Sequence, residues 1–211
     1  MEAKIFNRGK ETRASLDVTL PRQTTETNYY NVRDAAWEFL IKNNVVKFPI
    51  DIRALIQKNG WHLLSYSEAE KAGIWNEVKL NTMNQDGLTI AAEGRYMILY
   101  NDNQPEQRIR FTLAHEAGHI ILHKEYAGEK LETEANMFAS RILMPMCIIR
   151  ECQISTAEEL AKLCDVSLVA AGYRMERYNM VAKREMFYTN KLEKKYVGML
   201  APFIKQNKGK R

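Results

Sequence analysis

The sequence over residues 111–123 is Phe111-Thr112-Leu113-Ala114-His115-Glu116-Ala117-Gly118-His119-Ile120-Ile121-Leu122-His123. Most of these residues are apolar, which predicts a largely buried helix. Because helical residues four apart lie on one face, His115 and His119 can present two imidazoles to one metal ion. Glu116 is close enough to hold a metal-bound water without being a ligand. The pattern is typical of the H-E-x-x-H site of zinc peptidases, in which the glutamate is the general base.

The alternative interpretation is a helix with two surface histidines and a solvated glutamate. The apolar flanks argue against it, because buried imidazoles need polar partners. Three of the four histidines of the chain also fall within residues 115–123. We therefore favour a metal site.

Two histidines do not complete such a site, because a catalytic zinc ion takes three protein ligands and leaves the fourth position for water. His123 lies eight residues after His115, about 12 Å along a straight helix, so the two cannot share one ion. We expect His123 to pack or cap near the helix end.

The third ligand is expected from a second helix in residues 132–145, where apolar residues follow helical spacing and Pro145 marks the end. This helix can fold back onto the first. Glu134 immediately precedes Ala135, at the border of the apolar face, and is the favoured ligand. Glu132, nearer the start of the helix, stays open as the alternative.

At these residues the sequence resembles the ImmA/IrrE-type metallopeptidases. The segments that carry the resemblance are Arg110–His123 and Glu134-Ala135-Asn136-Met137-Phe138-Ala139-Ser140-Arg141-Ile142-Leu143-Met144-Pro145. Residues 161–174 resemble the helix-turn-helix-like segment of the same family, and the whole match spans about residues 45–178.

The resemblance implies His115, His119 and Glu134 as zinc ligands and Glu116 as the catalytic residue. It also implies a substrate class, helix-turn-helix transcriptional repressors of a phage, a mobile element or a stress response. Mn²⁺, Fe²⁺ or Co²⁺ can occupy a site of two histidines and a carboxylate, so the metal is expected to be Zn²⁺ with these as alternatives. A further donor for the oxyanion is left open among Tyr96, Tyr100, Tyr126 and Arg110.

The remaining segments predict an α+β domain with a small, mostly antiparallel sheet. Helices are expected over residues 29–43 and 49–60, a strand over 61–66 and a hairpin over 87–100. If a hairpin strand lies at the sheet edge beside the H-E-x-x-H helix, a substrate could add to it as an extra strand.

C-terminal helices follow Pro145. Ser155-Thr156 opens a short helix, and a second helix from Val166 runs to about Tyr178, which gives a helix-turn-helix-like pair. We expect this pair to be structural rather than DNA-reading, because the second helix offers few polar side chains to base edges.

The expected organisation is a flexible arm over 1–28, in which residues 16–20 could form a short strand, a metallopeptidase domain over 29–182 and a basic tail over 183–211. The net charge is +5, and the tail holds nine Lys or Arg against two Glu. A basic tail attracts nucleic acid or an acidic protein surface. Direct nucleic-acid binding through it is the weaker expectation, and a protein substrate is the stronger one.

Cysteine usage and hydropathy indicate a cytoplasmic protein. The three cysteines, Cys147, Cys152 and Cys164, are odd in number and show no paired metal spacing, so we expect reduced thiols. No apolar stretch reaches 18 residues and the N-terminus has no apolar signal core, so neither a membrane span nor secretion is expected.

Two functions from different classes remain. The first is a zinc endopeptidase that acts on a specific protein. The second is a non-catalytic regulatory protein that binds a metal and controls a repressor by binding it. The presence of Glu116 favours the first, because a structural zinc site needs no general base and is richer in cysteine.

Overall fold

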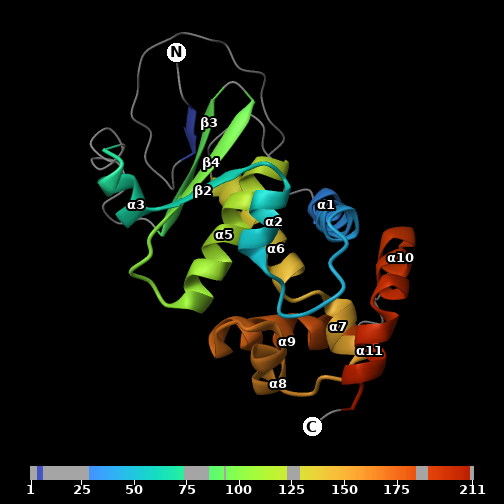
Figure 1. The fold of residues 1–211 in the computed structure, drawn as a ribbon. Coiled ribbons are helices and arrows are strands. Elements are labelled where there is room, and N and C mark those ends of the chain that lie inside the picture. The colour runs from blue at the N-terminus through green and yellow to red at the C-terminus, as the bar shows by residue number, and fades with distance from the viewer. Residues whose placement is uncertain are drawn as a thin grey trace.

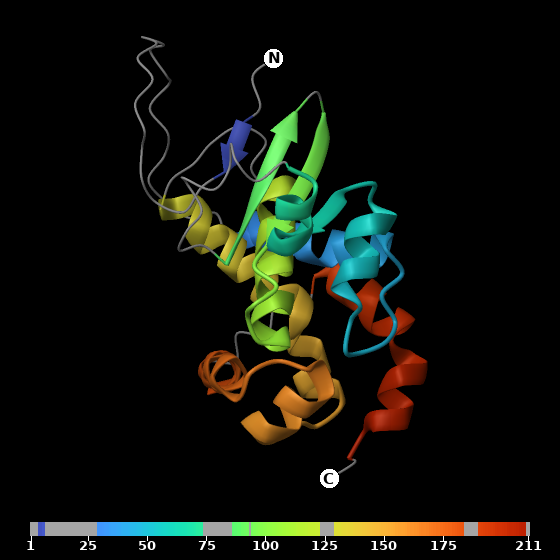
Figure 2. The ribbon, with the colours of Figure 1, turned by 60° about the vertical axis from the view of Figure 1, so that its left-hand side comes forward.

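A small twisted sheet and a group of helices from the C-terminal half lie at opposite ends of the molecule, with two helices packed against each other between them (Figures 1 and 2). The computed structural model describes residues 4–6, 29–73, 86–92, 94–122, 129–183 and 190–209. In chain order, the elements are β1 (Lys4–Phe6), α1 (Tyr29–Lys42), α2 (Ile52–Lys58), β2 (His62–Ser65), α3 (Tyr66–Lys71), β3 (Gly87–Ala92), β4 (Arg95–Tyr100), α5 (Glu106–Leu122), α6 (Glu129–Leu143), α7 (Met146–Glu151), α8 (Ala157–Cys164), α9 (Leu168–Lys183), α10 (Lys191–Met199) and α11 (Ala201–Asn207). The predicted α+β class is confirmed.

The sheet has the strand order β1-β3-β4-β2. The pairs β1–β3 and β3–β4 are antiparallel and β2–β4 is parallel, so the sheet is mostly antiparallel as expected. Neighbouring residues of a strand face opposite sides. In β4, Ile98 therefore joins the main core, while Leu99 joins a smaller cluster with Leu88 and Ala69 of α3.

The helices α5 and α6 pack against each other, and α5 also contacts β3 and β4. Gly118 of α5 makes the close approach possible. A Cβ at this position would lie 3.2 Å from the Ala135 Cα and 3.3 Å from the Phe138 Cβ, both on α6. The two helices can therefore come nearer than any larger residue would allow. As predicted, α6 ends before Pro145.

The end of the molecule opposite the sheet is built from α7, α8 and α9 (Figure 1). Thr156 and Glu159 form the capping box of α8, as the Ser155-Thr156 signal indicated. Arg110 of α5 holds this region in place, because its buried guanidinium donates to the backbone carbonyls of Asp165 (3.0 Å), Ile50 (2.9 Å) and Cys164 (3.2 Å).

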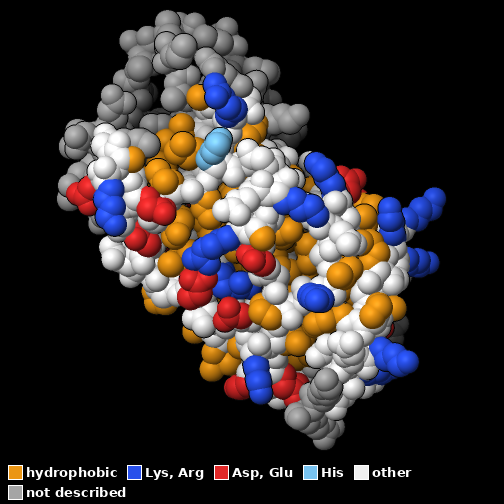
Figure 3. Space-filling model, in the orientation of Figure 1, with side chains coloured by type: hydrophobic (Ala, Val, Ile, Leu, Met, Phe, Trp, Pro, Cys, Tyr) orange, Lys and Arg blue, Asp and Glu red, His pale blue; other side chains and the backbone are white. Residues whose placement is uncertain are grey.

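The helices α10 and α11 carry part of the basic tail. Tyr196 and Leu200 are fully buried, and Tyr196 packs on Trp37 of α1 with ring centroids 5.4 Å apart. Lysine side chains project from the opposite face of these helices (Figure 3). The division at residue 183 stays a prediction, although these contacts join residues 190–209 to the main core.

Several expectations fall on residues outside the described ranges. These are the part of the arm over residues 7–28, with its possible strand at 16–20, and the side chains of His123 and Tyr126. Residues 4–6 of the arm form β1. Within the described ranges, no helix combines the length and apolar character that crossing a membrane requires.

Candidate metal centre

Two imidazoles and one carboxylate converge where α5 meets α6. The Nε2 atoms of His115 and His119 are 3.0 Å apart. The carboxylate of Glu132 lies 3.3 Å from the first and 3.2 Å from the second. Among the described residues, these three form the group whose ligand atoms lie within 4.8 Å of one another. The helical spacing predicted for His115 and His119 therefore brings both to one point.

Asn136 fixes the protonation of the first imidazole. Its Oδ1 lies 2.9 Å from the Nδ1 of His115 and accepts a hydrogen bond from it. With the proton on Nδ1, the Nε2 of His115 carries a lone pair that points at Glu132 and His119. Lone pairs of nitrogen and carboxylate oxygens at about 3 Å repel one another unless a proton or a cation lies between them.

The distances fit a zinc ion. Zinc binds imidazole nitrogen and carboxylate oxygen at about 2.0–2.2 Å with tetrahedral geometry, which places neighbouring ligand atoms about 3.3–3.5 Å apart. The observed separations of 3.0–3.3 Å are close to these values. Three ligands leave one tetrahedral position for water or a substrate oxygen.

Glu132 is the carboxylate of this group. Burial raises the pKa of the Glu132 carboxyl, but His115 and His119 in their protonated forms outweigh burial through hydrogen bonds and positive charge and lower the pKa well below its ordinary value; a cation held between the three groups acts in the same direction. Glu134, the favoured ligand from the sequence, is also buried but is not part of the group. The geometry thus favours the alternative that the sequence left open.

Glu116 is held beside the group by the sheet. It is 3% exposed, and its Oε2 accepts a hydrogen bond of 2.8 Å from the hydroxyl of Thr89 in β3. Thr89 itself is fully buried. Its donation orients the carboxylate of Glu116, as a general base requires.

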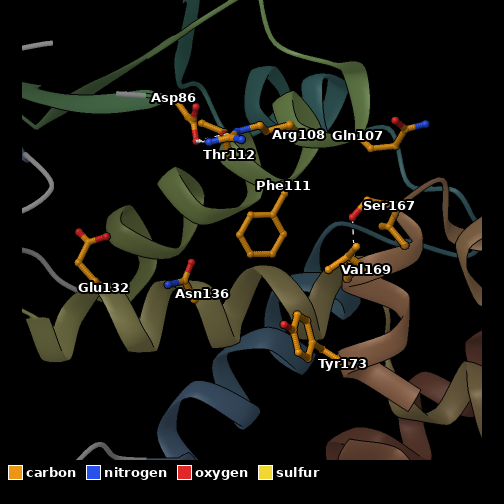
Figure 4. Close-up of a pocket in the computed structure, with 12 residues that line it drawn as sticks. Asp86, Gln107, Arg108, Phe111, Thr112, Glu132, Asn136, Ser167, Val169 and Tyr173 are labelled. Carbon is orange, nitrogen blue, oxygen red and sulfur yellow. Dashed lines mark hydrogen bonds and ion pairs between the residues drawn. The ribbon is translucent and has the colours of Figure 1, made fainter. Parts of the chain in front are cut away.

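A groove of about 660 Å³ runs from the metal centre toward α9. Figure 4 shows Glu132 and Asn136 on α6 at one end, Phe111 of α5 in the middle, and Val169 and Tyr173 of α9 at the other end. Val169 is 69% exposed and Tyr173 is 71% exposed, so the far wall presents apolar surface to the groove. The volume lies within the range typical of ligand-binding clefts.

Sequence reasoning missed two polar residues, Asn136 and Thr89. Asn136 was detectable in principle, because it lies four residues after Glu132 and so on the same helix face. Thr89 carried no signal, since its role depends on how β3 packs on α5. Of the residues left open for the oxyanion, Arg110 is committed to three backbone carbonyls, and Tyr96 packs edge-on against Trp61 at 6.5 Å.

The fold and the site together define the class of H-E-x-x-H metallopeptidase domains. The model of one peptidase family, described as the IrrE N-terminal-like domain, matches residues 69–176. The match covers about half of the chain and includes both helices of the site. The chain belongs to this family, as the sequence resemblance indicated.

Three curated relatives are similar to parts of the chain. The radiation response metalloprotease IrrE of Deinococcus radiodurans is 38% identical over 99 residues, which cover 37% of this chain and 30% of the relative. The protein of the same name from Deinococcus deserti is 34% identical over 100 residues, covering 38% of this chain and 36% of the relative. Metallopeptidase ImmA of Bacillus subtilis is 27% identical over 108 residues, covering 44% and 63%. The chain thus matches about a third of the length of the first two.

Proposed function

We propose that the protein is a zinc-dependent endopeptidase that hydrolyses a peptide bond in a specific protein. The observation that carries the proposal is the position of Glu116, a buried carboxylate held by Thr89 beside a group of three metal-ligating side chains. A metal site that served structure alone would need neither this carboxylate nor an open groove.

His115, His119 and Glu132 would hold the metal, and Asn136 would orient His115. Bound zinc supplies Lewis-acid chemistry, lowering the pKa of a water molecule toward about 7 and polarising the substrate carbonyl. Glu116 accepts the proton of the attacking water and passes it to the amine of the leaving peptide. The hydrogen bond from Thr89 keeps the carboxylate oriented during both transfers.

We propose a helix-turn-helix transcriptional repressor of a phage, mobile element or stress response as the substrate class. Support comes from family membership and from the surface of α9, the second helix of the helix-turn-helix-like pair. Four large apolar side chains of α9, those of Leu168, Val169, Tyr173 and Met180, are each at least 44% exposed, beside exposed Glu176 and Arg177. Such a face suits a protein partner better than base edges or phosphates.

The proposed location is the cytoplasm. The cysteines Cys147, Cys152 and Cys164 are all buried and free. Burial raises the pKa of the Cys147 and Cys164 thiols, which keeps them protonated and unreactive. Unpaired buried thiols are typical of a reducing compartment.

The proposal is tested by expressing the chain and its Glu116→Gln variant, each beside a helix-turn-helix repressor encoded next to it. Blotting and mass spectrometry follow the repressor, and metal content is measured on both purified proteins. We expect both to bind zinc and only the unmodified chain to yield a discrete repressor fragment. An intact repressor that loses DNA binding equally with both versions would instead support a non-catalytic regulatory protein.

A further inference from the structure

A second hollow adjoins the groove on the side away from the metal. It has a volume of about 560 Å³ and lies between α6, α7 and α9. The two spaces share four lining residues, Phe111, Asn136, Ala170 and Tyr173, so they adjoin each other, and we refer to them together as the channel. Figure 4 shows three of these residues, Asn136, Phe111 and Tyr173, in the lining of the groove.

Three arginines line this second hollow, and among the residues that the structure describes no carboxylate lines it. Arg141 on α6 is half-buried, Arg174 on α9 is 7% exposed, and Arg177 lies one turn beyond Arg174 at the rim. Arg174 donates from Nε to the Met144 carbonyl at 2.7 Å, which aims its guanidinium but supplies no counter-charge. Within the described residues, none of the three lies within ion-pair distance of an acidic side chain.

Burial lowers the pKa of each buried guanidinium, and the arginines also lie close enough to repel one another, which lowers it further. Burial and the neighbouring Arg33 and Arg177 lower the pKa of Arg141 to about 10, with Asp34 as the opposing charge. Asp34 is engaged by the side chains of Arg33 and Asn190. Burial and the nearby Arg141 lower the pKa of Arg174 to about 9. Unpaired buried cations are costly, so the hollow is built to receive an anion.

The walls favour an anion carried by a peptide. Met137, Met144 and Met146 line the hollow together with the aromatic rings of Phe111 and Tyr173. Flexible methionines and aromatic rings suit the apolar parts of a polypeptide, whereas a nucleic-acid backbone requires basic groups spread along an open surface. The channel also leads directly to the metal centre, where the scissile bond must lie.

The helix α6 sets the distance between the two ends. Glu132 and Arg141 are nine residues apart on this helix, a rise of about 13 Å along its axis, and because nine residues turn the helix by about 900° the two side chains leave it on opposite faces, so this rise is a lower bound on their separation. An extended peptide covers that distance in about four residues.

We propose that the hollow lined by Arg141, Arg174 and Arg177 is a specificity subsite for an aspartate or glutamate side chain of the protein substrate, at least about four residues from the bond that is cut. This subsite rests on the proposed peptidase function. Arginine is suited to the role because its planar guanidinium binds a carboxylate with two parallel hydrogen bonds.

The test uses the full chain carrying Glu116→Gln, loaded with zinc, so that bound peptides are retained and not cut. A random decapeptide pool is passed over the immobilised protein, and retained peptides are sequenced by mass spectrometry. We expect Asp and Glu to be enriched at least threefold. Arg141→Gln and the exposed Arg177→Gln, each added singly, should remove most of the enrichment. Arg53→Gln is the matched control, because it removes one arginine charge from an exposed pair with Glu106 that lines neither space.

A second arm gives retained peptides to the unmodified chain. Cleavage at least about four residues from an acidic side chain supports the subsite. Retention with acidic preference but no cleavage keeps the subsite and counts against the peptidase function. An empty pool, no acidic preference, or a preference that both arginine variants leave intact overturns the subsite. A 20-base-pair DNA duplex that binds more weakly to both arginine variants, with no acidic preference among peptides, would make the hollow a phosphate site instead.

Discussion

At the scale of single residues, His115 is held from two directions by one helix. Asn136 fixes its Nδ1 proton, and Glu132, one turn earlier on α6, faces its Nε2. The ligand and the residue that orients the other ligand are therefore four residues apart and move together. A metal site built this way is preorganised, because the orientation of the imidazole does not have to be established when the ion binds.

Asn136→Leu is expected to weaken zinc binding by about 10–100-fold, because it removes the acceptor that holds the Nδ1 proton of His115. Asn136→Asp keeps an acceptor at the same place and should retain most of the affinity. Competition with a chelator of known affinity measures both. Equal affinities for the two variants would mean that Asn136 does not orient the ligand.

Glu132→Gln and Glu134→Gln form a matched pair that identifies the third ligand. We expect Glu132→Gln to lose most of the bound zinc, since an amide is a far poorer ligand than a carboxylate. Glu134→Gln should bind zinc nearly as well as the unmodified chain. Metal content after dialysis decides between them, and the reverse result would restore the ligand favoured by the sequence.

Much of the centre was predictable at this scale, and the third ligand shows the limit. The relative positions of His115, Glu116 and His119 follow from their spacing along one helix, and that spacing can be read from the sequence. The choice between Glu132 and Glu134 depends on how α6 is rotated against α5. Glu132 lies three residues before buried Ala135 and so on the same face of α6, but Glu134 is buried as well. Only the packed structure separates the two.

At the scale of elements, the packing of α5 against α6 brings the side chains of the metal centre together. Gly118 lies between the two histidines in sequence and directly against the backbone of Ala135. The distance from the imidazoles to Glu132 is thus set by the absence of a side chain at residue 118. The end of α6 and the start of α8 were predictable from Pro145 and from the capping box at Thr156, whereas α5 begins at Glu106, five residues before the segment from which the sequence predicted it.

Gly118→Ala is expected to weaken zinc binding about tenfold. The new methyl group would meet the Ala135 backbone at 3.2–3.3 Å, so the two helices must separate by a few tenths of an ångström. Gly172→Ala in α9 is the control, because nothing lies within 4 Å of its Cβ position. The control should gain about 0.5–1 kcal/mol of stability from helix propensity without changing zinc affinity. An unchanged affinity in Gly118→Ala would show that α6 yields without moving Glu132.

Arg110→Met is expected to lower the free energy of unfolding by about 2–4 kcal/mol, because three carbonyls from two segments lose a charged donor at once. Arg108→Met is the comparison, since exposed Arg108 is bonded to Asp86 and its loss should cost within about 1 kcal/mol. Urea denaturation followed by circular dichroism measures both. Similar costs would mean that Arg110 is dispensable for joining α5 to α8.

At the scale of the whole molecule, the metal centre lies between a sheet and a helical end, and the channel crosses from one to the other. The α+β class and the helical C-terminal half were predictable from periodicity and turn residues. The channel was not, because its walls come from α5, α6 and α9, which are brought together only by tertiary packing. The helix α7 was also missed, since Pro145 indicated an end without indicating that a new helix begins directly after it.

The strand β1 bears on the expected binding of a substrate as an added strand. It pairs antiparallel with β3, and Phe6 lies opposite Thr89, the residue that holds Glu116. The edge of β3 that an incoming peptide would use is already occupied by the N-terminal part of the chain. Any substrate that binds there must first displace β1.

If substrates bind on β3, then β1 competes with them for the same strand edge, and substitutions in β1 can change the strength of that competition. Adjacent residues of an edge strand point their N–H groups to opposite sides, so substituting Lys4→Pro and Ile5→Pro together removes the one of these two donors that faces β3 and should release β1 from β3. If substrates bind on β3, cleavage should become several-fold faster, because less of the enzyme population is self-occupied. The double alanine substitution at the same positions keeps the backbone donors and should leave the rate near that of the unmodified chain. An unaltered rate in the proline variant would place substrate binding wholly in the channel. Residues 4–6 would then matter for the stability of the fold and not for the access of substrate to β3.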